Sequence, residues 1–154
     1  MTRTIPVQRG EMAIFEPVSL RWNDVDLYGH VNNAVYFQLF DSAMCKWMRR
    51  IRLIDGERSN IFVTASNSCE YLREVLFEDD VEVGFGIDRV GNSSVRYRIA
   101  LFRMKDPDVL AQGNLVQVSV DRATRRPARL SPDEIALFTG ILCASRAVAP
   151  ATAD

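Results

Sequence analysis

Residues 21–52 read RWNDVDLYGHVNNAVYFQLFDSAMCKWMRRIR and join a polar turn to an amphipathic helix. Aspartate, asparagine and glycine crowd the first part, residues 23–32, which predicts a loop around the chain's single histidine, His30. In the second part, apolar side chains recur at steps of three and four: Tyr36, Phe37, Phe40, Met44, Trp47, Met48 and Ile51. That spacing places them on one face of a helix, and the face is wide enough to form a core.

The ends of this helix can be predicted from residue types. Asparagine is a favoured N-cap, and both Asn32 and Asn33 stand where the apolar periodicity begins. We expect the helix to run to about Leu53, where Asp55 and Gly56 would end it.

After this helix the apolar residues recur with a period of two, which is typical of strands. The expected strands are residues 12–22 before the helix and residues 61–77, 81–90, 95–101 and 109–121 after it. For residues 61–77 the more apolar row is expected at odd positions: Ile61, Val63, Ala65, Cys69 and Tyr71. Together they predict an antiparallel meander that wraps around the long helix, an α+β fold. Residues 131–134, SPDE, form a capping box that predicts a short helix to about Cys143.

Length and composition predict one domain. The chain has 154 residues, and we expect a loose arm at residues 1–11, a single domain at residues 12–143 and a disordered tail at residues 144–154. Nineteen basic and twenty acidic side chains nearly cancel, so no global field favours nucleic acid or an anionic membrane. No apolar run approaches the roughly 20 residues of a membrane span, and the first residues lack the apolar core of a signal peptide, so the cytoplasm is the expected compartment. The three cysteines show no CxxC spacing, so neither a disulfide framework nor a metal site is expected, and no cofactor is implied.

The start of the long helix carries the residues best suited to chemistry. Its first N–H groups have no helical partner, and they can polarise a carbonyl and hold the oxyanion that forms when the carbonyl is attacked. Asp26 precedes Asn33 by seven residues, close enough for its carboxylate to activate water or to attack directly. His30 could orient a substrate or only hold the loop. Because such aspartates and asparagines also serve as turn and cap residues, these residues alone leave acyl transfer and a structural role both open.

A second group of candidates is basic. The arginines cluster around the hairpin at residues 91–92 and after the last expected strand: Arg89, Arg96, Arg98, Arg122, Arg125, Arg126 and Arg129. Such a cluster can bind a phosphorylated ligand, and it can equally be a solvated loop.

These residues resemble a known family. The segment RWNDVDLYGHVNNAVYFQLFD, followed by YLREV, VGNSSVRYRIALF and AQGNLVQVSVDRATRRP, is similar to the hotdog-fold acyl-CoA thioesterases of the 4-hydroxybenzoyl-CoA thioesterase type. The resemblance covers roughly residues 12–140. Its specific part is the signature D-x-D-x-x-G-H-V-N-N-x-x-Y, formed here by Asp24, Asp26, Gly29, His30, Val31, Asn32, Asn33 and Tyr36.

The resemblance implies roles for individual residues. It makes Asp26 the nucleophile or general base, the Asn33 N–H the oxyanion donor and His30 an assisting group, as in the plant acyl-carrier-protein thioesterases that share HVNN. Those plant enzymes carry an asparagine where this chain has Tyr28. The family's sites lie at a dimer interface, which implies a homodimer or a dimer of dimers.

The resemblance also implies a substrate, an acyl thioester of CoA or of an acyl-carrier protein, and the arginine cluster favours CoA. The acyl group would lie beside the central helix near Tyr36, and the CoA phosphates would meet surface residues: Arg89, Ser93, Ser94, Arg125 and Arg126. Residues near Asn67 or Glu70 of a second subunit would line the pocket. Two other activities remain open, namely acyl-CoA binding without turnover and hydration or dehydration of an enoyl thioester.

Overall fold

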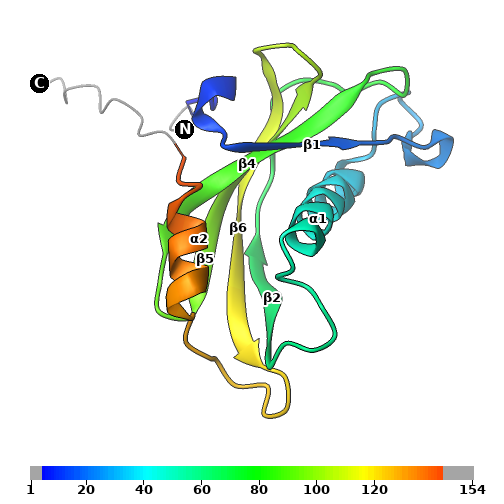
Figure 1. Ribbon diagram of the computed structural model, residues 1–154. Coiled ribbons are helices and arrows are strands. Elements are labelled where there is room, and N and C mark those ends of the chain that lie inside the picture. The colour runs from blue at the N-terminus through cyan, green and yellow to red at the C-terminus, as the bar shows by residue number, and fades with distance from the viewer. Residues whose placement is uncertain (1–4, 144–154) are drawn as a thin grey trace, which may run out of the picture.

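The computed structural model describes residues 5–143, and one antiparallel sheet organises them (Figure 1). Its strands are β1 Ile14–Val18, β2 Asn60–Asn67, β3 Glu70–Tyr71, β4 Val81–Val90, β5 Ser94–Arg103 and β6 Val109–Asp121. The sheet is curled, and the long helix α1, Asn33–Arg50, and the short helix α2, Pro132–Thr139, pack on the same apolar core, since the Tyr97 ring meets Trp47 of α1 and Phe138 of α2. This arrangement confirms the expected hotdog architecture.

The order of the strands differs from a simple meander. Only β4, β5 and β6 are neighbours in sequence and in space, whereas β1 pairs with β4 and β2 pairs with β6. The order is β1-β4-β5-β6-β2, with β3 also on β6. The chain therefore crosses from one edge of the sheet to the other through α1. Periodicity could not predict this, because it reports which residues are strands and not which strands pair.

The expected strand at residues 61–77 is wrong in two respects. It is divided into β2 and β3, and the chain then leaves the sheet until β4. The predicted apolar row is also wrong before the β-bulge between Thr64 and Ser66, which shifts the alternation, and it is right at Cys69 after the bulge. Before the bulge Phe62, an even position, packs on the core, and after it Cys69, an odd position, does so.

Helix α1 supplies the centre of the core. Asn32 is its N-cap, because the Asn32 side chain accepts a hydrogen bond from the Ala34 N–H at 2.9 Å. The helix packs mainly on β1 and also on β4 and β5. Its fully buried side chains include Phe40 and Met44. The Trp47 ring meets the Phe85 ring edge-on at 5.4 Å, an arrangement that aromatic pairs prefer.

The helix ends three residues earlier than expected. Arg52 adopts a left-handed conformation with φ of 60°. The Leu53 N–H then donates to the Met48 carbonyl at 2.8 Å, and the Arg52 N–H donates to the Arg49 carbonyl at 3.1 Å. This is a Schellman motif. The end is thus set by Arg52, and the Asp55-Gly56 pair that was expected to end the helix lies beyond it.

The N-terminal segment is more ordered than the expected loose arm. Residues Arg9–Glu11 form a 3₁₀ helix, and Val7 is buried. Strand β1 is shorter than the predicted residues 12–22, because Trp22–Asp24 form a second 3₁₀ helix. Residues 1–4 and the expected disordered tail, residues 144–154, lie outside the described residues.

Helix α2 starts at the predicted capping box, since the Ser131 hydroxyl accepts from the Glu134 N–H at 3.1 Å. It ends at Thr139 and not near Cys143, because the following residues extend along β4. There the Cys143 N–H donates to the Ile87 carbonyl at 2.8 Å. Within residues 5–143, no helix combines the length and apolarity needed to cross a membrane.

Candidate active site

The loop before α1 is shaped by Asp24. Its buried carboxylate accepts hydrogen bonds from the Arg21 N–H at 2.7 Å and from the Arg21 guanidinium at 2.9 Å. Burial opposes the charge of Asp24, but the Arg21 donors outweigh burial and lower the pKa of this carboxyl below its ordinary value of 3.8. The Asp24 carbonyl also accepts from the Asn32 N–H at 2.8 Å. Asp24 therefore ties the loop to the N-cap of α1, which is a structural role.

Asp26 is the other aspartate of the signature, and its two carboxylate oxygens differ. Oδ1 accepts from the Tyr28 N–H at 2.8 Å and from the His30 N–H at 3.3 Å, an arrangement that closes the turn. The Asp26 N–H in turn donates to the His30 carbonyl at 2.8 Å. Within residues 5–143, Oδ2 has no hydrogen-bond partner. One oxygen thus shapes the loop, and the other is available to a water molecule or a substrate.

The first turn of α1 offers a donor for a developing negative charge. The Asn32 cap is bonded to the Ala34 N–H. The Asn33 N–H, one residue earlier, has no acceptor among residues 5–143. Asn33 is exposed, so its amide can be reached from outside. A free N–H at the positive end of a helix is suited to an oxyanion.

His30 is held by a segment that the sequence analysis did not select. Its Nε2 lies 3.0 Å from Oε2 of Glu74. The adjacent Val31 N–H donates to the Val75 carbonyl at 2.8 Å. The segment between β3 and β4 thus forms one side of the signature loop. Only the tertiary structure shows this, because nothing in the pattern of residues 72–80 marks it as a partner of His30.

Two tyrosines, Tyr71 and Tyr36, pack against each other at the first turn of α1. The Tyr71 hydroxyl donates to the Asn33 carbonyl at 2.9 Å, and its ring meets the Tyr36 ring edge-on at 4.9 Å. Tyr36 is only 3% exposed, so within one chain it supports the site from below and does not line an open pocket. Burial raises the pKa of Tyr36 to about 12, and the nearby Cys69, Tyr71 and Asp26 add to the shift against an opposing Arg103.

Cys69 is poorly suited to act as a nucleophile. Burial raises the pKa of its thiol to about 11, with Tyr71 acting in the opposite direction. The thiolate, which is the reactive form, is therefore scarce at neutral pH. Among residues 5–143 no three histidine, cysteine, aspartate or glutamate side chains gather in a way that could hold a metal ion.

Comparison with known proteins now identifies the family. The family model of the thioesterase-like superfamily matches residues 20–138. The chain belongs to this superfamily. The match includes the whole signature loop, helix α1, all of α2 except its last residue, and every strand except β1.

Solved structures with this fold are similar to the thioesterase-like chain over most of its length. The PA5185 protein of Pseudomonas aeruginosa strain PAO1 is 32% identical, with a TM-score of 0.86 over 92% of this chain and 100% of that protein. A thioesterase of Thermus thermophilus, solved with coenzyme A and Zn, is 30% identical, with a TM-score of 0.72 over 84% of this chain and 95% of that protein. Among curated proteins, the uncharacterized protein YsmA of Bacillus subtilis is 28% identical over 83 residues, which are 54% of this chain and 56% of that protein. The match thus spans little more than half of this curated relative.

The residues predicted to meet CoA phosphates lie far from the start of α1, at the opposite end of the sheet of this thioesterase-like chain. We call this region the arginine end: the β4–β5 hairpin with Arg89, Ser93 and Ser94, and the loop after β6 with Arg125 and Arg126. The structure brings these two segments together, since the Leu130 N–H donates to the Asn92 carbonyl at 2.9 Å. It does not bring them to Asp26. Tyr71, which contacts the first turn of α1, pairs with Ala111, whereas Ser94 pairs with Val118, and seven residues of β6 span about 24 Å.

Three other arginines of the cluster are not free for phosphate. Arg98 binds Glu11 and Asp88. The Arg122 guanidinium donates to the carbonyls of Arg58 and Asp55. Arg96 lies 3.7 Å from Asp88. Arg89, Arg125 and Arg126 are exposed and have no side-chain partner among residues 5–143.

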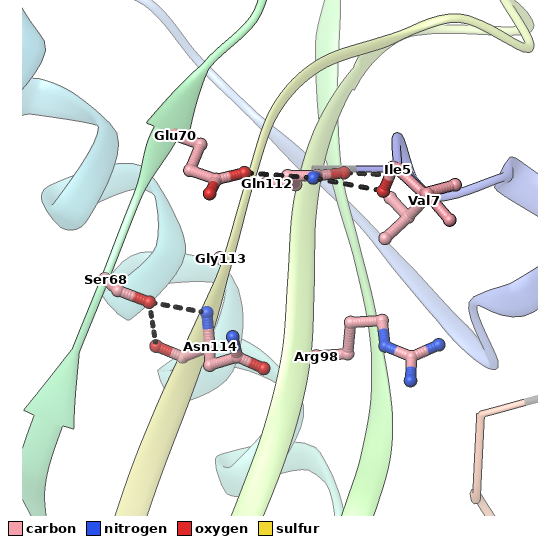
Figure 2. A pocket seen from close by; sticks show the side chains of 8 residues that line it. All are labelled: Ile5, Val7, Ser68, Glu70, Arg98, Gln112, Gly113 and Asn114. Carbon is pink, nitrogen blue, oxygen red and sulfur yellow. Dashed lines mark hydrogen bonds between the residues drawn. The ribbon is translucent and has the colours of Figure 1, made fainter. Parts of the chain in front are cut away.

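A small cavity of about 190 Å³ lies on the face of the sheet opposite α1 (Figure 2). Its polar groups bond to one another. The Gln112 side chain accepts from the Val7 N–H at 2.7 Å and donates to Glu70 at 3.1 Å, and the Ser68 hydroxyl accepts from the Asn114 N–H at 3.1 Å. Gln112 therefore anchors the N-terminal segment to the sheet, a role that the sequence analysis missed.

Proposed function

We propose that this chain is an acyl-CoA thioesterase of the 4-hydroxybenzoyl-CoA thioesterase type, with its site at the helix mouth. We define the helix mouth as residues 24–32 and the first turn of α1. One observation carries the proposal: the free Oδ2 of Asp26 lies in the same loop and turn as the unbonded Asn33 N–H. A base or nucleophile beside an oxyanion donor is what acyl transfer requires.

The reaction follows from these two groups. Asp26 takes a proton from water as the water oxygen bonds to the thioester carbon, or its Oδ2 attacks that carbon and water hydrolyses the resulting anhydride. In either case the carbonyl oxygen becomes an oxyanion, which the Asn33 N–H stabilises. The carbon–sulfur bond then breaks, and the CoA sulfur leaves as the thiolate and takes up a proton. In the first route the acyl group leaves at once as the free acid. In the second route it stays on Asp26 as the anhydride until water releases the free acid.

Coenzyme A is the proposed carrier because of the arginine end. The exposed Arg89, Arg125 and Arg126 suit phosphate groups, and a similar thioesterase was solved with coenzyme A. Because the arginine end and the helix mouth lie apart in one chain, the proposal requires a second copy. Strand β2 provides the edge for it.

Strand β2 is the better of the two sheet edges for pairing. It has eight residues, with Thr64, Ala65 and Ser66 exposed. The other edge, β1, has five residues and contains Pro17, which cannot donate to a ladder. The Asn60 end of β2 lies beside Asp121, where the loop of the arginine end begins, and the Asn67 end lies toward the helix mouth. Antiparallel pairing of two copies of β2 about a two-fold axis therefore brings the arginine end of one copy to the helix mouth of the other.

The first experiment measures free-thiol release from short, medium, long and aromatic acyl-CoAs. Asp26→Asn is expected to lower kcat by about 10² to 10⁴-fold, because general-base or nucleophilic chemistry is lost. His30→Ala is expected to lower kcat less, because His30 is proposed to assist Asp26 and not to attack the thioester. Asp133→Asn, an exposed aspartate on α2, is the matched control and is expected to keep full activity. A wild-type protein that binds acyl-CoA but releases no thiol from any substrate would contradict the proposal in favour of a binding protein or an enoyl-thioester hydratase.

The second experiment tests the shared site by subunit mixing. Asp26→Asn and the double variant Arg125→Ala/Arg126→Ala are unfolded and refolded together, and turnover is measured at low acyl-CoA concentration. Mixed dimers then contain one site with a native Asp26 and native arginines, so about a quarter of the wild-type sites should return at equal amounts. Activity no higher than the sum of the two separate variants would contradict a site built from two subunits.

A further inference from the structure

The His30–Glu74 contact joins two segments that are distant in sequence. Nε2 of His30 lies 3.0 Å from Oε2 of Glu74, and the two side chains are 41% and 62% exposed. An exposed pair on flexible side chains contributes little, because ordering both side chains costs about as much as the contact gains. The backbone around this pair therefore decides whether it has a function.

Both backbones are fixed where the pair forms. The His30 N–H and carbonyl are each bonded to Asp26, at 3.3 Å and 2.8 Å. On the other side, the Glu74 carbonyl accepts from the Arg103 guanidinium at 3.1 Å. The next residue, Val75, is completely buried and its carbonyl accepts from the Val31 N–H at 2.8 Å. The two side chains therefore start from set positions, and the usual entropic cost of a surface pair is reduced.

Arg103 also holds the segment that carries Glu74. Its guanidinium binds both carboxylate oxygens of Asp79, at 2.9 Å and 3.1 Å, as well as the Glu74 carbonyl. Asp79 also accepts from the Leu76 N–H at 2.9 Å. Residues 74–79 are thus tied to the end of β5, and this tie fixes the place from which Glu74 reaches His30.

The contact also distinguishes the two nitrogens of the imidazole ring. A carboxylate accepts protons and cannot donate one when ionised, so the nitrogen beside it is the nitrogen that carries the hydrogen. For His30 that nitrogen is Nε2. In the neutral ring, Nδ1 then holds the lone pair and is the nitrogen left for exchange with other groups.

We propose that Glu74 is a positioning residue for His30, which holds the neutral imidazole as the Nε2–H tautomer and leaves Nδ1 to serve the helix mouth. What Nδ1 does there rests on the proposed thioesterase function, in which His30 assists the reaction of Asp26. The tautomer itself is a property of the folded chain and can be measured without substrate.

The experiment uses the fact that the chain has a single histidine. A long-range ¹H–¹⁵N spectrum of the uniformly ¹⁵N-labelled protein, recorded at a pH where the ring is neutral, shows one imidazole and reports which nitrogen is protonated. The wild type is expected to show the Nε2–H form. Glu74→Ala is expected to raise the population of the Nδ1–H form, and Glu74→Gln is expected to keep the wild-type tautomer, because the amide oxygen still accepts from Nε2–H.

The matched control is Glu78→Ala, which removes another exposed glutamate from the same segment, and its spectrum is expected to equal that of the wild type. A wild-type spectrum dominated by the Nδ1–H form would overturn the proposal, and so would a Glu74→Ala spectrum identical to the wild type. Because all variants are compared as folded proteins by the same amide spectrum, a change at His30 alone is separated from a loss of structure.

Kinetics then connects the tautomer to the reaction. Glu74→Ala is expected to lower kcat for acyl-CoA hydrolysis by about 10-fold with little change in KM, since the ring loses both its fixed orientation and its single tautomer, which impairs chemistry and not binding. Glu74→Gln is expected to restore most of the loss. If the wild type releases no thiol while the tautomer follows Glu74 as expected, the proposed function fails and the role of Glu74 stands.

Discussion

The helix mouth and the arginine end are organised in opposite ways. At the helix mouth the loop is held by bonds within the chain: Asp24 to Arg21, one oxygen of Asp26 to two amides, and His30 to Glu74. At the arginine end Arg89, Arg125 and Arg126 are exposed, with no side-chain partner among residues 5–143. The first arrangement suits chemistry, which needs fixed groups, and the second suits phosphate binding, which tolerates long and adaptable cations.

This difference predicts that changes at the helix mouth affect both stability and turnover. Asp24→Ala removes the acceptor of the Arg21 donors and loosens the loop that carries Asp26. We expect the free energy of unfolding to fall by about 2–3 kcal/mol and kcat to fall with it, as measured by urea denaturation and thiol release. Glu57→Ala, an exposed change at a side chain with no hydrogen bond or ion pair among residues 5–143, serves as the control. Unchanged stability in Asp24→Ala would show that the loop is not built as described.

Changes at the arginine end should affect binding alone. The double variant Arg125→Ala/Arg126→Ala is expected to raise KM for acyl-CoA by about 10-fold, about 1.4 kcal/mol, with kcat and stability preserved. The rise should shrink at high salt, because the lost contacts are electrostatic and screened. A fall in kcat at unchanged KM would place these arginines in the chemistry and remove the contrast between the two ends.

The segment that carries Glu74 should make the free energy of unfolding depend on pH in the acid range, through Asp79. The pKa of Asp79 is lowered from 3.8, because the hydrogen bonds from Arg103 and from the Leu76 amide outweigh burial. A carboxyl with a depressed folded-state pKa adds stability above 3.8, and this part is lost as the pH falls below 3.8 through the lower folded-state pKa. We therefore expect the free energy of unfolding to decline over this range in the wild type and less steeply in Asp79→Asn. Equal slopes in urea denaturation from pH 5 to 3 would contradict this.

The smallest expected effect concerns the hydrogen bond between Tyr71 and the first turn of α1. Tyr71→Phe removes the hydroxyl that donates to the Asn33 carbonyl. Because Asn33 is exposed, water can replace this donor, so the loss in stability should be about 0.5–1 kcal/mol. The edge-on contact with Tyr36 is kept in this variant. A loss above about 2 kcal/mol would mean that Tyr71 also supports the first turn in ways beyond one hydrogen bond.

Several parts of the fold could be predicted from residue patterns. The 3.6-residue period of the helix gave α1, and the capping box gave the start of α2. Strands β4, β5 and β6 followed from alternation and from turn residues. Predictions failed where a feature breaks the period or depends on a distant partner. The bulge at residues 64–66 reversed the buried row of β2, and the left-handed Arg52 ended α1 early.

For the candidate site, the sequence by itself determined which residues gather around the start of α1. Asp26, His30 and Asn33 lie within eight residues, so a single turn followed by a capped helix brings them together. Only the tertiary structure decided which oxygen of Asp26 stays free, that Glu74 and Tyr71 come to the helix mouth, and that Arg125 and Arg126 lie at the far end of β6. Short-range geometry follows from local propensity and capping, whereas contacts across many residues depend on how the sheet pairs and curls.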